Sequence, residues 1–197
     1  RLRTFTPMNE AIFTPRPPTQ NARQQSIADA VEELAHAGGV EERGAIFTRR
    51  EVVNFILDLA GYTSDRPLHK ISILEPSFGD GDFLLPAVDR LLAAWRASGK
   101  PGEPLEALGN CVRGVELHRD SYVRTHAALI ARLIGEGIKA VAAESLADTW
   151  LLHGDYLLAE LPESFDVVVG NPPYVRQEMI PNVLLAEYRE RYTTIFD

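Results

Sequence analysis

The spacing of apolar residues divides the chain into alternating helices and strands. Helical periodicity predicts helices over residues 26–37, 48–61, 83–97, 119–134 and 183–192. Short apolar runs predict strands over residues 71–74, 111–117, 150–153 and 165–169. Because the strands are apolar on both faces and alternate with helices, we predict an α/β fold with a doubly wound, mostly parallel sheet.

Several segments carry more specific local signals. Thr48 is a good helix N-cap, and Glu51 three residues later completes a capping box. Prolines and weak periodicity predict an extended arm over residues 1–23, and the glycine- and proline-rich stretch 99–104 is a loop. Residues 135–147 fit either a short helix or a covering loop.

Charge and composition narrow the function classes. The formal net charge of −8 argues against strong DNA binding by this chain alone, because nonspecific affinity comes from Lys and Arg that neutralise phosphates. The single cysteine, Cys111, excludes an intramolecular disulfide and a cysteine-built metal site. No signal peptide or membrane-spanning run is visible. We expect a cytoplasmic protein with no bound metal and no membrane partner.

The turn after the first predicted strand favours a cationic ligand. Gly79 and Gly81 permit a tight turn and remove the Cβ atoms that would block a ligand lying over the backbone. The turn has neither a Gly-x-Gly-x-x-Gly motif nor a Gly-Lys-Ser/Thr motif, which are the sequences that bind phosphates. Asp80 and Asp82 would also repel a phosphate. The alternative is a simple turn between a strand and a helix.

Acidic residues also end the second and third predicted strands. Glu116 stands where a carboxylate can accept hydrogen bonds from both hydroxyls of a ribose. Asp155 could accept from an adenine amino group, with Tyr156 against the ring. The alternatives are a solvated loop carboxylate for Glu116 and a helix N-cap for Asp155.

The fourth predicted strand leads into the most specific motif of the chain. Pro172 and Pro173 fix the backbone and withhold two N–H donors. The side-chain oxygen of Asn171 and the carbonyl of Pro172 are then two acceptors, which suit an exocyclic amine with two protons. Tyr174 offers a stacking face beside them. The alternative is an ordinary Pro-Pro turn.

Together these motifs resemble those of the amino-methyltransferases. The strand followed by Asn-Pro-Pro-Tyr and the earlier segment 75–83, Glu-Pro-Ser-Phe-Gly-Asp-Gly-Asp-Phe, carry the resemblance. Residues 44–53, with Phe47 and Thr48, are similar to the segment that precedes the cofactor motif in gamma-class N6-adenine DNA methyltransferases of restriction-modification and related phage-defence systems. Arg49 stands where that family usually has Pro.

The resemblance covers about residues 44–178 and implies a Rossmann-like fold dependent on S-adenosylmethionine. The family's sheet has seven strands and this chain supplies four, so we expect the N-terminal part of the catalytic domain over residues 44–197, preceded by an arm and helix over 1–43. The target-recognition domain would lie outside. We therefore expect duplex DNA to be bound mostly by other regions, either the remainder of the enzyme or a partner subunit.

The resemblance also implies roles for individual residues. The catalytic motif that holds a flipped adenine would be formed by Asn171, Pro172, Pro173 and Tyr174. S-adenosylmethionine, and S-adenosylhomocysteine as product, would be bound by Phe47, Thr48, Glu75, Ser77, Gly79, Gly81, Phe83, Glu116, Leu117, Asp155, Tyr156 and Asn171. The alternatives are a protein glutamine or RNA amino-methyltransferase, and a cofactor-binding fragment that is inactive without a partner.

Overall fold

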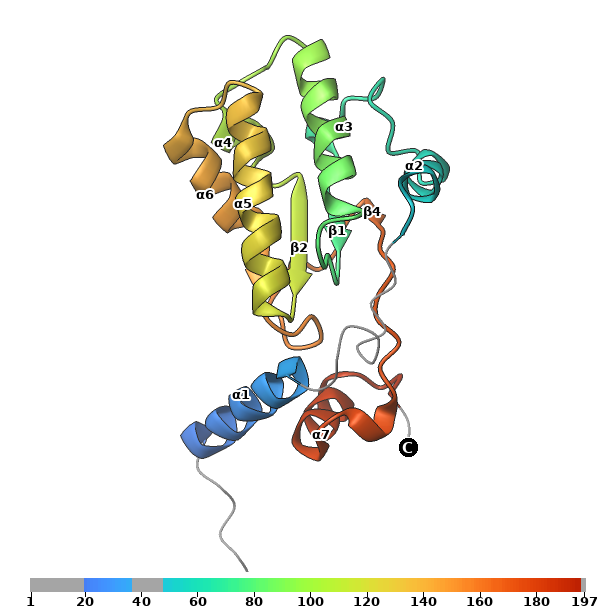
Figure 1. Cartoon of the computed structure of the whole chain (residues 1–197), viewed down its shortest axis with the longest axis vertical. Coiled ribbons are helices and arrows are strands. Elements are labelled where there is room, and N and C mark those ends of the chain that lie inside the picture. The colour runs from blue at the N-terminus through green and yellow to red at the C-terminus, as the bar shows by residue number, and fades with distance from the viewer. Residues whose placement is uncertain (1–19, 37–47, 196–197) are drawn as a thin grey trace, which may run out of the picture.

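The computed structural model describes residues 20–36 and 48–195, and its centre is a parallel sheet (Figure 1). The strands in these residues are β1 (Ile73–Glu75), β2 (Val112–Glu116), β3 (Leu151–His153) and β4 (Val167–Val168). They run parallel in the order β3-β2-β1-β4, and Ile73 of β1 pairs with Val112 on one side and Val167 on the other. The predicted parallel α/β fold is confirmed.

Within the described residues, helices precede, alternate with and follow the strands. They are α1 (Gln20–His36), α2 (Arg50–Leu59), α3 (Leu84–Ala97), α4 (Pro104–Leu108), α5 (Arg119–Gly135), α6 (Ala140–Trp150) and α7 (Asn182–Arg191), with two short 3-10 turns, η1 (Leu68–Lys70) and η2 (Gln177–Met179). The five longer predicted helices are all present. The segment that fitted either a helix or a loop forms most of α6, and α4 was not predicted.

The main core lies between the sheet and the helices. The buried positions of α3 include Leu84, Val88, Leu91 and Trp95, which recur at helical spacing and so form one face. Helix α5 packs against α6 and β3, and the buried Trp150 indole donates to the carbonyl of Leu108 at 3.0 Å. Burial of each such large side chain stabilises the fold by about 1.5–3 kcal/mol.

The strand order places a topological switch point between β1 and β4. From β1 the chain adds β2 and then β3 on one side, and returns to place β4 on the other side. In open α/β sheets, ligands bind beyond the carboxyl ends of the strands at such a point. A Cβ atom at Gly170 would lie 3.5 Å from side-chain atoms of Glu75 and Pro76, so the chain segments that leave β4 and β1 are in contact here.

Two local expectations are wrong. Thr48 does not cap α2, whose N-cap is Arg49 without any side-chain cap hydrogen bond. The backbone N–H and side-chain oxygen of Thr48 instead make tertiary hydrogen bonds, which displace the capping box. The strands are also not all buried on both faces, since Leu152 of β3 is 41% exposed and Val168 of β4 is 60% exposed. In the described residues, no further strand covers these positions.

A second, smaller core joins the two ends of the described chain. Ala30 of α1 packs with Leu184 and Tyr188 of α7. Arg23 of α1 also forms ion pairs with Glu187, at 2.7 Å, and with Glu190. Figure 1 shows this helix pair beyond the carboxyl ends of the strands. The predicted arm over residues 1–23 is wrong at its C-terminal end, because residues 20–23 form the first turn of α1, which begins before the predicted residue 26. The rest of that arm and the predicted boundary at residue 44 lie outside the described residues. No helix in the described ranges is long and apolar enough to cross a membrane.

Candidate active site

The glycine turn after β1 presents open backbone at the sheet edge. Gly79 and Gly81 have φ angles of +51° and +87°, a region that side-chain-bearing residues rarely adopt. A Cβ at Gly81 would lie 2.7 Å from the Leu85 side chain, whereas a Cβ at Gly79 would meet nothing within 4 Å. Gly81 is therefore required by packing, and Gly79 leaves space above the turn.

Glu116 at the end of β2 holds this turn in place. One carboxylate oxygen accepts from the N–H of Gly79 and the other from the N–H of His118, both at 2.7 Å. The hydroxyl of Thr125 donates to the Gly79 carbonyl at 2.9 Å on the other side of the same residue. Because Glu116 is only 3% exposed, it is not a solvated loop carboxylate, which was the alternative.

Negative charge is concentrated next to the turn. Glu75 is 4% exposed, and its Oε2 atom has no hydrogen-bond partner among the described residues. Burial, and then the negative charges of Asp82 and Glu116, raise the pKa of Glu75 well above its ordinary value. A buried polar atom without a partner, beside two further carboxylates, fits a cationic ligand. The positively charged ammonium and sulfonium groups of S-adenosylmethionine suit these three acidic side chains.

Thr48 connects the turn to the loop after β4. Its N–H donates to Asp82 Oδ2 at 2.9 Å, and its Oγ1 accepts from Asn171 Nδ2 at 3.4 Å. The nitrogen of the Asn171 amide is thus used within the protein, which leaves the Oδ1 atom as an acceptor. We did not predict a contact for Asp82, because the sequence indicated only that its charge would repel a phosphate.

The rest of the Asn-Pro-Pro-Tyr loop faces solvent. Pro172 is exposed, Pro173 is half-buried, and the N–H of Val175 donates to the Pro173 carbonyl at 3.1 Å. Tyr174 is 76% exposed, more than any other large apolar or aromatic side chain of the site. Its ring is therefore free to stack on a planar group.

Asp155, after β3, is held by two donors. The N–H of Gly154 donates to the Glu116 carbonyl at 2.9 Å, which keeps the ends of β2 and β3 together. Asp155 Oδ1 accepts from the N–H of Leu157 at 2.8 Å, and Oδ2 accepts from the hydroxyl of Tyr188. A turn rather than a helix follows, so Asp155 is not a helix N-cap. Tyr156 is 39% exposed. Tyr188 lies on α7, far from Asp155 along the chain, so no local signal in the sequence points to this contact.

The structure places the other predicted cofactor residues less centrally. Ser77 and Leu117 are half-buried, and the Leu117 carbonyl lies 3.1 Å from Nε2 of His153. Phe83 is 2% exposed and belongs to the main core. Phe47 lies outside the described residues. The contacts therefore bring together Thr48, the turn after β1, Glu116 and Asn171, with Asp155 joined to them through the pairing of β2 and β3.

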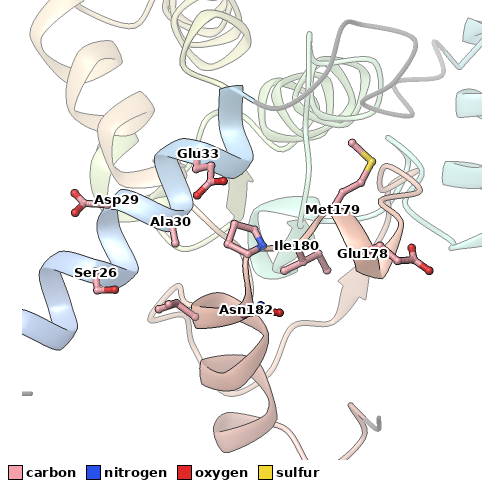
Figure 2. A pocket seen from close by; sticks show the side chains of 10 residues that line it. Ser26, Asp29, Ala30, Glu33, Glu178, Met179, Ile180 and Asn182 are labelled. Atoms are coloured by element: carbon pink, nitrogen blue, oxygen red, sulfur yellow. The ribbon is translucent and has the colours of Figure 1, made fainter. Parts of the chain in front are cut away.

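A cavity of about 540 Å³ lies away from this cluster, between α1 and residues 178–183 (Figure 2). It is lined by Ser26, Asp29, Ala30, Glu33, Glu178, Met179, Ile180, Pro181, Asn182 and Val183. None of the predicted catalytic or cofactor-binding residues that the structure describes belongs to this lining. The described residues also contain no cluster of His, Cys, Asp and Glu that could hold a metal ion.

A parallel α/β sheet with these motifs at its switch point has the Rossmann-like methyltransferase fold. Residues 112–197 match the Eco57I restriction-modification methylase family. The chain is 61% identical over 171 residues to the type II methyltransferase M.PaeR7I of Pseudomonas aeruginosa, an alignment that covers 87% of this chain and 30% of that protein.

Two further relatives carry the same type of name. The type II methyltransferase M.XhoI of Xanthomonas vasicola is 52% identical over 80% of this chain and 29% of that protein. M.BstVI of Geobacillus stearothermophilus is 45% identical over 78% of this chain and 28% of that protein. The chain is thus similar to restriction-modification methyltransferases, and it spans about 30% of the length of these curated relatives.

Proposed function

We propose that this chain is the cofactor-binding and catalytic portion of an adenine-specific DNA methyltransferase. The reaction would transfer a methyl group from S-adenosylmethionine to the N6 amine of an adenine flipped out of duplex DNA. The type II names of the relatives support a DNA substrate. The observation that carries the proposal is the setting of Asn171 at the switch point.

Asn171 is prepared as an acceptor. Its amide nitrogen donates to Thr48, which leaves Oδ1 available to accept from a substrate, and the carbonyl of the next residue, Pro172, would be a second acceptor. An exocyclic amine has two protons to give to this pair. Its lone pair is shared with the ring, and the two hydrogen bonds would localise that lone pair on the nitrogen as the reaction proceeds. A ring carbon has no such protons, which argues against methylation at carbon.

The proton must leave the nitrogen after the methyl group has arrived. Neither an amide oxygen nor a backbone carbonyl is a good general base, so Asn171 and Pro172 would only orient the amine. The methylated amine, which is then positively charged, would lose its proton to solvent. The choice of adenine over other amines rests on the resemblance of the Phe47-Thr48 segment to the gamma class.

The remaining acidic residues would hold the cofactor. S-adenosylmethionine, when bound, supplies a methyl group on a positively charged sulfur. The unpaired Oε2 of Glu75 would accept from the cofactor's ammonium group. Glu116, already fixed by two backbone donors, would accept from the ribose hydroxyls, and Asp155 from the adenine amine.

Tyr174 would support the flipped base. Extrusion of a base from the duplex costs about a few kcal/mol. Stacking on an aromatic ring offsets about 1–3 kcal/mol of this, and Tyr174 is exposed enough to provide it. Because the chain carries a net charge of −8, the phosphate contacts would come mostly from other regions of the protein.

A glutamine or RNA amino-methyltransferase would use the same acceptors, but the type II relatives favour DNA. Another alternative is a chain that binds the cofactor but transfers nothing without a partner. Assays of methyl transfer to unmodified plasmid, with this chain and with the intact protein side by side, distinguish it from an active enzyme.

The substitution Asn171→Ala in the intact protein tests the role of the amide. We expect methyl transfer to fall by about 10²–10³, the usual effect of removing one transition-state hydrogen bond. Binding of S-adenosylhomocysteine, measured by calorimetry, should change little, and the exposed Asn182 gives a matched control as Asn182→Ala. Parallel loss of binding and transfer in Asn171→Ala would mean that Asn171 is structural.

A further inference from the structure

The pair of helices α1 and α7 contacts the candidate site at two places. Figure 2 shows α1 facing the segment that leads into α7, and their buried contact is made by Ala30, Leu184 and Tyr188. Leu157 and Leu158, just after Asp155, pack against the same cluster. The helix pair is therefore anchored on the loop that follows β3.

Both contacts reach residues next to the predicted adenosine-binding carboxylates. At one end, the hydroxyl of Tyr188 donates to Asp155 Oδ2. At the other, the Ala35 carbonyl of α1 lies 3.0 Å from Nδ1 of His118, whose N–H donates to Glu116. The pair thus spans the ends of β2 and β3, where the cofactor's ribose and adenine would lie.

Tyr188 is well suited to fix a carboxylate. It is 3% exposed, so its ring is held by the surrounding apolar side chains. Burial, followed by the hydrogen bond to Asp155, raises the pKa of Tyr188, so the hydroxyl is a proton donor at neutral pH. The N–H of Leu157 donates to the other oxygen of Asp155, at 2.8 Å. Each carboxylate oxygen then has one fixed partner.

We propose that Tyr188 is a positioning residue for the cofactor's adenine, because its buried hydroxyl fixes the Asp155 carboxylate that accepts from the adenine amine. An ionised carboxylate has about four acceptor sites, so two are still open after Tyr188 and Leu157 have donated. This inference rests on the proposed function, which assigns the adenine amine to Asp155. It adds that α7, which follows the catalytic loop along the chain, fixes the carboxylate that would bind the adenine amine.

The test compares two ligands that differ at the adenine amine and in the proton carried by the adjacent N1 atom. S-adenosylhomocysteine carries the adenine amine, and S-inosylhomocysteine has an oxygen in its place. Calorimetry on the full chain should show that Tyr188→Phe lowers the affinity for S-adenosylhomocysteine about 3- to 10-fold, which corresponds to the net contribution of one hydrogen bond. The affinity for S-inosylhomocysteine should stay at the wild-type value.

Tyr192→Phe is the matched control. Tyr192 follows α7, and its hydroxyl donates to the Leu157 carbonyl at 2.8 Å rather than to Asp155. Its removal should leave the ratio of the two affinities unchanged. Equal weakening of both ligands by Tyr188→Phe, the same change of ratio in Tyr192→Phe, or no effect of Tyr188→Phe would each overturn the inference.

Asp155→Ala keeps the test decisive if Tyr188→Phe does not fold. This variant should lose the preference for S-adenosylhomocysteine, and adding Tyr188→Phe to it should cause no further change, since the hydroxyl acts through the carboxylate. An unchanged preference in Asp155→Ala overturns the inference while cofactor binding stands. A folded wild-type chain that binds neither ligand refutes the proposed function itself, and the inference with it.

Discussion

Glu75 gives the sharpest prediction, because its burial has opposite consequences for the free and the ligand-bound protein. The side chain is 4% exposed, Oε2 has no partner in the described structure, and Asp82 and Glu116 add negative charge. All three features disfavour the ionised form, and only a hydrogen bond from the Leu84 backbone favours it. Substitution Glu75→Gln removes the charge and keeps the shape.

The sign of the stability effect follows from the raised pKa. A carboxyl whose folded-state pKa lies above its unfolded value of 4.5 stabilises the fold at low pH, and this contribution is lost as pH rises through the folded-state pKa. An unsatisfied buried polar group costs about 1–3 kcal/mol, and a charged group costs more. Above the folded-state pKa, Glu75→Gln should therefore raise the free energy of unfolding by at least about 1 kcal/mol, or about 2–4 °C in Tm.

Ligand affinity should change in the other direction. A cation bound at Glu75 lowers its pKa, so S-adenosylmethionine should bind more tightly as pH rises, with release of a proton from Glu75. Charge-assisted hydrogen bonds contribute about 1.5–3 kcal/mol, so Glu75→Gln should lower the affinity for S-adenosylmethionine about 10- to 100-fold.

Thermal unfolding and calorimetry between pH 5 and 8, in buffers of different ionisation enthalpy, measure both effects. Asp80→Asn is the matched control in the same turn, because Asp80 is exposed and its carboxylate forms a surface ion pair with Arg124, at 2.7 Å. It should change neither stability nor affinity much. A less stable Glu75→Gln protein with unchanged affinity would refute the reasoning, as would wild-type affinity that falls with rising pH.

Two further substitutions test the packing of the site. Thr48→Ala in the intact protein should lower kcat about 10-fold or more, because the Asn171 amide loses its acceptor. Thr48→Ser keeps a hydroxyl at this position and should have a kcat close to that of the wild type. Equal activity of the two variants in steady-state kinetics would exclude the orienting role of Thr48. Gly114→Ala should destabilise the fold by about 1–3 kcal/mol, since the new methyl would lie 2.8 Å from the buried Phe78 ring. Gly135→Ala, which meets nothing within 4 Å, is its control in thermal unfolding, and equal Tm values would contradict this account.

The sequence predicts the fold well because its signals are local and repeated. Alternating apolar runs and helical periodicity indicated a parallel sheet, and topology alone then required that Glu75, Glu116, Asp155 and Asn171 end their strands at one edge. The turn glycines, Gly79 and Gly81, were recognisable for the same reason, since a tight turn after a strand requires backbone angles that favour glycine.

Contacts between distant segments were not predictable in this way. Thr48 and Glu51 form a complete capping box in the sequence, but the hydrogen bonds of Thr48 to Asp82 and Asn171 take precedence. Tyr188 contacts Asp155 from α7, which packs on α1 and on the loop after β3, and neither helix carries a local sign of that packing. The exposure of Val168 likewise depends on which strands adjoin β4, which is information outside the strand itself.

The identity of the methylated atom tests the central claim most directly. The intact protein is incubated with unmodified plasmid and S-adenosylmethionine labelled in its methyl group, and the DNA is digested to nucleosides for mass spectrometry. We predict that the label appears in N6-methyldeoxyadenosine, and that it disappears in Asn171→Ala. Label on cytosine, or transfer that persists undiminished in Asn171→Ala, would contradict the account.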